Sequence, residues 1–483
     1  MTLAGRRALL VQDPGSAAAQ ANLGLALKQA GDMAAAIGAY RRALRLAPDF
    51  AQIHNNLGSA LHQSGEAEEA GTSYRKAIAL APGIPSSYFN LANLLQAPSG
   101  FQHALRLEPA HPDLHGGLAV LEQHHDRLDR AIPGYRRAVA LQPDRPDFYT
   151  NLGNGLRQAG DLSSAENSYR RALILAPGQS DASFNLSLLL LLTGRLGEGW
   201  PGYEYRWETE QLRKERRNFP APLWQGEAAA GKTLLLHGEQ GFGDTLQFCR
   251  YAGLAKARGL RIIFEVQPPL RRLLQPLAGC DQVIARGEPL PAFDFHCPLL
   301  SLPLILGTNS LADIPAPVPY LQADAALWAD RMVGEGLRVG LAWAGAPRLD
   351  SPVQAAFDRR RSVSFSSLAP ILAVPGVRFF SLQKGVVAGS GLTDFMAEMA
   401  DFADTAALVA NLDLVISVDT AIAHLAGAMG KPVWLLNRFD TDWRWLTEGE
   451  SSAWYPTMRI FRQGSPGDWA GVIDAAARAL QSA

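Results

Sequence analysis

A glycine-rich loop at residues 238–245 places one aspartate where it could act as a general base. The loop reads Gly-Glu-Gln-Gly-Phe-Gly-Asp-Thr and follows an apolar run that predicts a buried strand. Glycines allow the backbone to approach a substrate, so Gly241, Gly243 and Thr245 are predicted to line an acceptor site. The carboxylate of Asp244 could accept a proton from an acceptor hydroxyl. The alternative is that Asp244 only caps the following helix.

A second candidate site lies near the C-terminus, where the apolar run 414–418 meets the turn Asp419-Thr420-Ala421. A helix of small residues follows and carries His424. A strand, a polar turn and a helix N-terminus in succession present backbone N–H groups to an anion. Such a turn also lies where open parallel sheets bind their ligands. We therefore expect the turn to contact an anion, with His424 either a further contact or a buried core histidine.

Strand and helix patterns alternate twice after residue 232, which predicts two Rossmann-like halves facing each other across a cleft. A proline-rich segment at residues 315–319 separates the two sets and favours a hinge. We therefore predict an acceptor-side lobe at residues 208–330 and a ligand-binding lobe at residues 331–483.

The run from Gly226 to Thr233 matches the phosphate-loop pattern GxxxxGK[ST]. That loop works only when it follows a strand and opens a helix, so that helix N–H groups face the phosphates. Here the run follows a linker and is predicted to open a strand. Binding of ATP or GTP through it is therefore not expected.

The N-terminal part of the chain repeats a motif at a regular spacing. The step from Asn22 to Asn56 is 34 residues, and aromatic and proline landmarks keep the same interval. Each unit predicts a helix pair in which small residues allow close approach, an aromatic ring fills the gap and a proline ends the second helix. The third unit is 27 residues long, which predicts a shorter pair. Residues 1–207 are assigned to this array.

Asparagines share one position on the first helix of five units: Asn22, Asn56, Asn90, Asn151 and Asn185. A primary amide offers both a donor and an acceptor, so a ladder of amides could pair with a polypeptide backbone without reading its sequence. The asparagines could equally tie neighbouring helices together. Gly117 interrupts the ladder.

Composition excludes several classes of function. The net charge of −1 gives no basic surface for tracking nucleic acid. The three cysteines lack metal-binding spacing, and no convincing acidic loop motif calls for a metal ion. The first 15 residues lack the apolar core of a secretory signal, and no apolar run is long enough to span a bilayer. A cytoplasmic protein is expected.

Together with the repeats, several motifs resemble bacterial tetratricopeptide-repeat glycosyltransferases, including flagellin-modifying enzymes. More distant similarity is to lipopolysaccharide heptosyltransferases and O-linked N-acetylglucosamine transferases. The motifs are the glycine-rich loop and residues 339–345, 381–384, 401–405 and 417–427. The resemblance implies an α-solenoid of tetratricopeptide repeats followed by an α/β two-lobed GT-B glycosyltransferase fold.

The resemblance also implies roles for individual residues. Asp244 matches the position of the catalytic aspartate of heptosyltransferases, and the turn at residues 419–421 matches the turn that contacts the nucleotide-sugar donor. Arg361 and Lys384 would neutralise the donor diphosphate, or would remain solvated surface charges. The donor-binding residues expected in full are Trp343, Gly345, Arg361, Gln383, Lys384, Asp419, Thr420, Ala421 and His424.

The function that these expectations predict is inverting, metal-independent transfer of a sugar from a nucleotide-sugar to a protein hydroxyl. The repeats would present the acceptor, which would be flagellin or another surface protein. Neither a cofactor nor a metal ion nor nucleic acid is expected as a partner. Two alternatives stay open: a catalytically silent interaction scaffold, and a transferase acting on a lipid-linked or surface glycan.

Overall fold

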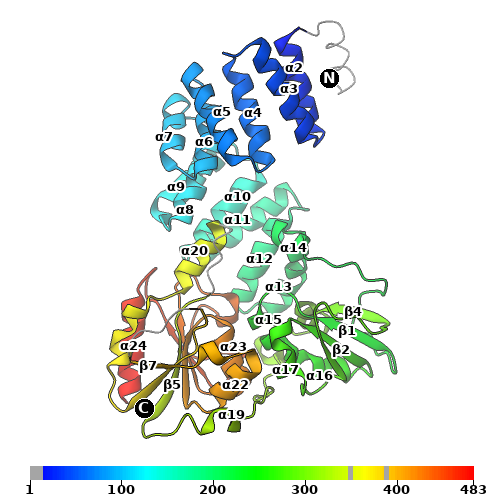
Figure 1. The fold of residues 1–483 in the computed structure, drawn as a ribbon, viewed down its shortest axis with the longest axis vertical. Helices are drawn as coiled ribbons and strands as arrows, with labels where there is room; N and C mark the ends of the chain where they lie inside the picture. The colour runs from blue at the N-terminus through cyan, green and yellow to red at the C-terminus, as the bar shows by residue number, and fades with distance from the viewer. Residues whose placement is uncertain (1–14, 346–351, 386–390, 483) are drawn as a thin grey trace. The chain divides into compact units, whose positions relative to one another are not determined.

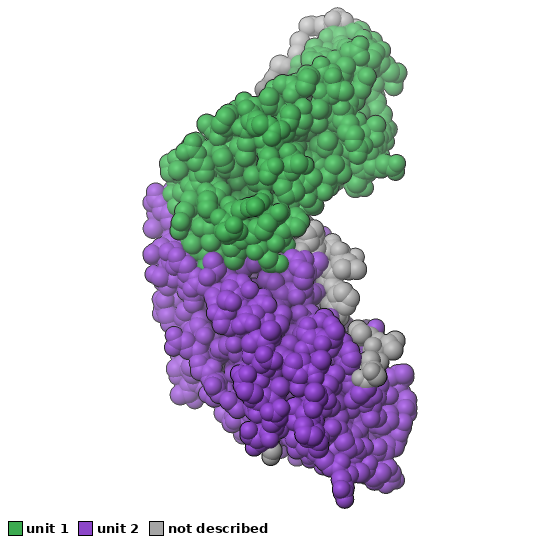
Figure 2. Space-filling model, turned by 90° about the vertical axis from the view of Figure 1, so that its left-hand side faces the viewer, with its two compact units in different colours: residues 1–156 green, residues 157–483 purple. Residues whose placement is uncertain are grey.

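The computed structural model describes residues 15–345, 352–385 and 391–482, without the side chains at 210, 211, 352 and 353. Two compact units divide the chain, residues 1–156 and residues 157–483, and Figure 2 colours them separately. The first unit consists of helical repeats. The second joins the last repeats to two parallel α/β sheets (Figure 1). The predicted fold class, a repeat solenoid followed by a two-lobed α/β region of GT-B type, is confirmed.

Antiparallel helix pairs form the repeats, as the 34-residue spacing predicts. The helices are α2 (Ala17–Gln29), α3 (Met33–Leu46), α4 (Ala51–Gln63), α5 (Ala67–Leu80), α6 (Pro85–Leu95), α7 (Pro98–Leu107), α8 (Pro112–His124), α9 (Leu128–Leu141), α10 (Pro146–Gln158), α11 (Leu162–Leu175), α12 (Ser180–Leu192) and α13 (Leu196–Tyr203). The 27-residue unit does have the shorter pair, with 11 residues in α6 and 10 in α7.

Glycine–tyrosine contacts set the spacing within a pair. A Cβ atom on Gly58 would lie 2.7 Å from the ring of Tyr74, and one on Gly24 would lie 2.7 Å from the ring of Tyr40. Both tyrosines are buried. The small residue is therefore needed because the aromatic ring fills the space that a side chain would occupy.

The first lobe is built on a four-stranded parallel sheet of order β3-β2-β1-β4. Its elements are β1 (Thr233–His237), α15 (Phe242–Phe248), α16 (Ala252–Lys256), β2 (Arg261–Val266), α17 (Arg271–Leu274), β3 (Gln282–Ala285), β4 (Phe295–Pro298) and α18 (Leu302–Ile305). Thr233 begins a strand, so the phosphate-loop pattern before it does not open a helix. The sequence pattern did not single out β4.

The second lobe is built on a six-stranded parallel sheet of order β10-β9-β8-β5-β6-β7. Its elements are β5 (Leu337–Ala342), α20 (Pro352–Arg361), α21 (Ala369–Leu372), β6 (Val377–Ser381), β7 (Leu392–Asp394), α22 (Phe402–Ala410), β8 (Leu414–Val418), α23 (Ala421–Ala428), β9 (Val433–Asn437), β10 (Met458–Arg462) and α24 (Trp469–Gln481). The strand order reverses between β5 and β8, and ligands of such sheets bind beyond the strand ends at that point.

One hydrophobic core runs through the last repeat and both lobes. Trp200 of α13, Leu236 of β1, Val415 of β8 and Trp443 belong to the same cluster of buried side chains. The last repeat is therefore an integral part of the second unit, as expected for a terminal repeat that docks on a neighbouring domain. The predicted domain boundaries at 207 and 330 stay predictions.

The close contact between Gly58 and Tyr74 predicts that a larger residue at position 58 destabilises the repeats. Gly58→Ala should lower the free energy of unfolding by about 1–3 kcal/mol, because the added methyl group overpacks the buried ring. Gly83→Ala is the matched control, since a Cβ atom there meets nothing within 4 Å. Urea unfolding followed by circular dichroism measures both variants. Equal stability of the two would show that the ring moves aside without cost.

Candidate functional site

The end of β5 and the end of β8 meet at the strand-order reversal of the second lobe, and Arg361 connects them. Its Nη1 donates a hydrogen bond to the carbonyl oxygen of Asp419 at 3.2 Å. A Cβ atom on Gly345 would collide with its guanidinium group. Asp358 holds the same guanidinium through an ion pair of 2.7 Å. The structure thus brings together Gly345, Arg361 and Asp419, three of the residues predicted to bind the donor.

The turn after β8 forms the predicted helix start. Thr420 is the N-cap of α23, and its hydroxyl accepts a hydrogen bond from the backbone N–H of Ile422 at 3.3 Å. Ser417 contacts the same hydroxyl at 3.1 Å. Asp419, Thr420 and Ala421 are each half-buried. The polar turn and the positive end of the helix dipole therefore lie together at the end of this strand.

Gln383 and Trp343 shape the turn after β5. The amide oxygen of Gln383 accepts hydrogen bonds from the backbone N–H groups of Trp343 at 3.1 Å and Ala344 at 2.9 Å. Both side chains are buried, and Trp343 packs on Phe365 with ring centroids 5.1 Å apart. These contacts stabilise the turn that carries Gly345. Lys384 follows β6 and is exposed.

Asp244 lies at the opposite lobe, in the first turn of α15. One carboxylate oxygen accepts a hydrogen bond from the backbone N–H of Gly241 at 2.9 Å, so the capping role weighed from the sequence is present. The other oxygen forms an ion pair with Arg444, which belongs to the second lobe. Each carboxylate oxygen has two lone pairs, so these contacts leave acceptor capacity for a substrate hydroxyl.

Arg444 ties the glycine-rich loop to the second lobe. Its guanidinium also donates to Asp442 at 2.9 Å and to Gln247 of α15 at 2.6 Å. Burial raises the pKa of Asp244 above its ordinary value, and Arg444 opposes that rise. Burial likewise raises the pKa of Asp419, with nearby Asp442 adding to the effect. The candidate base and the candidate donor turn therefore lie in one electrostatic cluster.

His424 is satisfied within the core. Its Nδ1 lies 2.9 Å from the hydroxyl of Tyr455, and its ring stacks on Trp445 with centroids 5.2 Å apart. Burial lowers the pKa of His424 to about 3, so the ring is neutral at physiological pH. A Cβ atom on Gly243 would lie 2.8 Å from the ring. His424 thus forms the packing surface on which the glycine-rich loop rests, and Gly243 leaves room for that contact.

The remaining loop residues fix the start of α15. Thr245 is buried and donates a hydrogen bond to Gln267 at 2.9 Å. Gly241 is exposed and precedes the first helical residue. A buried anchor and an exposed glycine together leave the loop backbone accessible on one side.

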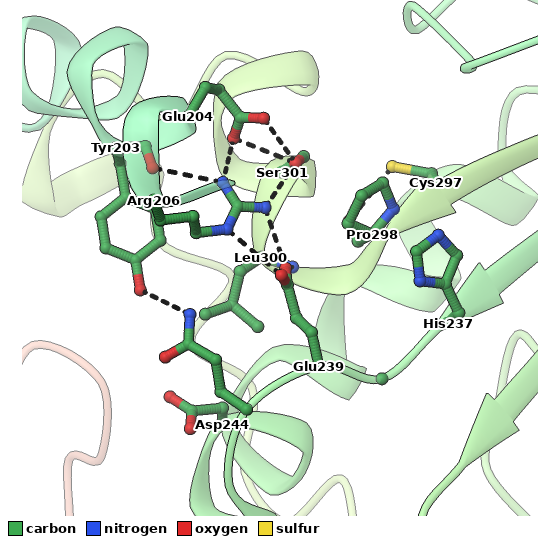
Figure 3. A network of polar contacts seen from close by, with 12 residues as sticks. Tyr203, Glu204, Arg206, His237, Glu239, Asp244, Cys297, Pro298, Leu300 and Ser301 are labelled. Carbon is green, nitrogen blue, oxygen red and sulfur yellow. Dashed lines mark hydrogen bonds and ion pairs between the residues drawn. The ribbon is translucent and has the colours of Figure 1, made fainter. Parts of the chain in front are cut away.

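A buried ion pair holds the glycine-rich loop from the side of the last repeat (Figure 3). The guanidinium of Arg206 donates to the carboxylate of Glu239 at 2.9 Å and to the hydroxyl of Ser301 at 2.8 Å. Glu239 also accepts from the backbone N–H of Leu300 at 3.0 Å. Arg206 is completely buried and Glu239 is 3% exposed. The repeat end, the end of β1 and the end of β4 are thereby joined beside Asp244.

One of the repeat asparagines makes the helix-tying contact that the sequence left open as an alternative. Asn90 donates a hydrogen bond to Asn55 at 2.9 Å and so ties neighbouring helices. Asn22 is exposed, whereas Asn56, Asn151 and Asn185 are half-buried. A peptide-binding role for this position stays a prediction.

Two arginines of the site were missed from the sequence. Arg206 follows the last predicted repeat helix, and Arg444 lies between two tryptophans, Trp443 and Trp445. An arginine flanked by aromatic residues in the sequence could have predicted a buried ion pair, because arginine is rarely fully buried unless it is paired.

Neither a metal-binding cluster nor a helix able to cross a bilayer occurs within residues 15–345, 352–385 and 391–482. In that part of the chain, His, Cys, Asp and Glu side chains form no group of three or more that could hold a metal ion. Every helix among the same residues is too short or too polar to cross a bilayer.

Segments in both parts of the chain match known protein families. Residues 6–49, 22–85 and 150–208 match the tetratricopeptide repeat model. Residues 391–436, which include β8 and α23, match glycosyltransferase family 9 (heptosyltransferase). Protein FlbA of Caulobacter vibrioides is 29% identical over 333 residues, covering 61% of this chain and 54% of that protein. The chain thus spans about half the length of this curated relative. Together these matches support a tetratricopeptide-repeat glycosyltransferase.

Solved structures of repeat proteins resemble part of the chain. The Cut9–Hcn1 hetero-tetramer of APC/C has a TM-score of 0.39 and 18% identity, covering 43% of this chain and 44% of that chain. The repeat protein TTC0263 of Thermus thermophilus has a TM-score of 0.33 and 23% identity, covering 36% of this chain and 100% of that chain.

The buried pair of Arg206 and Glu239 makes a stability prediction. Arg206→Met should lower the free energy of unfolding by about 3–5 kcal/mol, because Glu239 is left buried without its partner. Burial already raises the pKa of Glu239, so the loss should be greatest near neutral pH and should shrink as acid protonates the carboxyl group. Chemical unfolding at pH 7 and pH 5 measures it.

Two controls accompany this measurement. Adding Glu239→Gln to Arg206→Met should recover much of the stability, since the unpaired charge is removed. Arg331→Met breaks an exposed ion pair with Glu398 and should change little. If Arg206→Met behaves like Arg331→Met, the buried pair does not hold the loop.

Proposed function

We propose that this chain is an inverting glycosyltransferase that moves a sugar from a nucleotide-sugar donor to a hydroxyl group of a protein. The single observation that carries the proposal is the ion pair between Asp244 and Arg444. Through this ion pair Asp244, the candidate base of the first lobe, belongs to the same group of charged side chains as Asp419 of the second lobe. Asp419 lies where the strand order of the second sheet reverses. An in-line displacement requires the base and the leaving group on opposite sides of the anomeric carbon, and a base and an anion site on opposing lobes suit that requirement.

The leaving diphosphate would be stabilised at the end of β8. Arg361 supplies a cation beside Asp419 and Gly345, and α23 supplies the positive end of a helix dipole at Ala421. Lys384, exposed at the end of β6, could reach toward the same negative charge. These groups support transfer without a metal ion or any other cofactor, because they can neutralise the charge that develops on the phosphate oxygen.

Asp244 would act as the general base. As the acceptor oxygen bonds to the anomeric carbon, the bond from that carbon to the donor phosphate breaks and the acceptor proton passes to Asp244. Attack from the face opposite the leaving group inverts the configuration. Burial raises the pKa of Asp244, which makes its carboxylate a stronger base than an exposed aspartate.

A protein acceptor is proposed because the chain carries helical repeats, which in general form extended binding surfaces. The asparagine position shared by Asn22, Asn56, Asn90, Asn151 and Asn185 would pair with the acceptor backbone. A surface protein such as flagellin, modified in the cytoplasm, is the class of acceptor that we infer.

A silent scaffold is the second candidate, and one observation favours it. Both oxygens of Asp244 already have partners, Gly241 and Arg444, so the carboxylate has a structural role without any substrate. Only a measurement of turnover can therefore distinguish a catalytic role of Asp244 from a structural one.

Turnover by wild type and Asp244→Asn separates the candidates. The purified chain is screened with nucleotide-sugars, using release of the nucleotide and transfer to a protein acceptor or a lipid-linked glycan as readouts. Asp244→Asn should lower the transfer rate by roughly 10²–10⁴-fold and leave donor affinity nearly unchanged. The amide keeps the size of the side chain and its oxygen can still accept a hydrogen bond, but it cannot take up the acceptor proton. Exposed Asp330→Asn is the matched control and should retain full activity.

The pH profile gives the second readout. Asp244 must be ionised to accept a proton, so kcat/KM should fall as the pH drops through its pKa, which burial raises above the ordinary value of an aspartate. Donor binding by wild type without any turnover would establish the scaffold instead. Transfer to the glycan and not to the protein would overturn the acceptor assignment.

A further inference from the structure

A cavity of about 210 Å³ lies between the last repeats and the carboxyl ends of β9 and β10. Arg157 of α10 and Leu192 of α12 contribute to one wall. Arg438, Thr441 and Arg462, which follow or end the two strands, contribute to the other. The turn at Asp419 does not line this cavity, although Arg438 of the lining is close enough to Asp419 to oppose the rise in the pKa of that carboxyl group.

Residues that line the cavity carry buried nitrogen atoms that make no hydrogen bond. Among the described residues, Arg157 Nε, Arg438 Nε, Arg438 Nη1 and Gln463 Nε2 make no hydrogen bond. The orientation of the Gln463 amide is fixed, because its oxygen accepts from the backbone N–H groups of Phe439 at 3.0 Å and Gly467 at 3.2 Å. Buried donors without a hydrogen bond are costly, so their gathering around one cavity indicates a ligand rich in acceptors.

The charge of the cavity is positive. Arg157, Arg438 and Arg462 line it together with a single carboxylate, Asp440. Asp440 forms ion pairs with two arginines, Arg360 at 2.9 Å and Arg438 at 3.5 Å. One carboxylate therefore serves more than one arginine, and positive charge remains in surplus in the lining. A doubly charged anion complements this surplus better than a singly charged one.

Neighbouring contacts hold the arginines in place. The guanidinium of Arg438 lies 3.8 Å from the ring centroid of Phe357 and is only 5% exposed. Arg462 donates hydrogen bonds to the carbonyl oxygens of Gly449 at 2.8 Å and Leu446 at 3.0 Å. Because these side chains are already ordered, a ligand would bind them without a large loss of side-chain entropy.

We propose that this cavity binds a phosphate group as a second anion site, distinct from the donor turn. Guanidinium groups match the geometry of phosphate oxygens, and the surplus of donors and positive charge suits a phosphate dianion. The cavity volume exceeds that of several waters, at about 30 Å³ each, so a phosphate fits within it. Since repeat residues and strand-end residues share the walls, the bound phosphate would connect the repeat end to the second lobe.

Titration of the full chain with inorganic phosphate tests this proposal, measured by isothermal calorimetry. Arg157→Gln should weaken phosphate binding by about tenfold or more, because it removes one charged donor from the repeat wall. Arg459→Gln is the matched control. This arginine lies on the same strand as Arg462, is exposed and is outside the cavity lining, so its replacement should leave the affinity unchanged.

A second variant keeps the test decisive if Arg157→Gln does not fold. Thr447 is exposed and lines the cavity, so Thr447→Glu should abolish phosphate binding by repulsion while Thr447→Gln retains it. Unchanged affinity in both Arg157→Gln and Thr447→Glu would overturn the proposal, as would absence of phosphate binding by the wild type. Acetate binding as tightly as phosphate would overturn the assignment of a phosphate ligand.

Discussion

Buried ion pairs are the constraint on which the architecture of the second unit depends. Removing a charged group from water costs several kcal/mol unless partners replace the lost hydration. Asp244 meets that requirement through its ion pair with Arg444 of the other lobe, and Glu239 through its ion pair with Arg206 of the last repeat. The backbone N–H groups of Gly241 and Leu300 add one hydrogen bond to each carboxylate. Each pair therefore joins segments that are far apart in the sequence, and both converge on the glycine-rich loop. The two pairs hold the loop in a defined position because each buried carboxylate is tied to an arginine from a distant segment.

Packed aromatic side chains join the same three parts of the second unit as the ion pairs. Trp200 of α13 packs edge-on against Trp443, and Phe248 of α15 packs against Trp454. The last repeat, the first lobe and the second lobe thus share one water-excluding core, beside which the ion pairs are strengthened by the low dielectric. The proposed transfer requires the glycine-rich loop and the turn after β8 to keep a fixed distance, and this combination of packing and charge is suited to fix it.

The sequence predicted the parts of the protein that depend on local pattern. The repeat spacing, the short third pair and the strand–turn–helix at Asp419 follow from periodicity and turn residues, and the structure contains all of them. The partners of Asp244 and Glu239 could not be predicted, because Arg444 and Arg206 are brought to the loop only by tertiary packing. His424 illustrates the same limit, since its contact with Tyr455 is invisible to spacing along the chain.

Amide hydrogen exchange on adding a nucleoside diphosphate tests the central claim most directly. That claim is that the turn after β8 holds the donor diphosphate opposite the glycine-rich loop. The account predicts slower exchange at residues 419–424, with further protection at residues 241–245 once a full nucleotide-sugar is added. Protection confined to residues 226–233, where the phosphate-loop pattern occurs, would contradict the account, as would binding that leaves residues 419–424 unprotected.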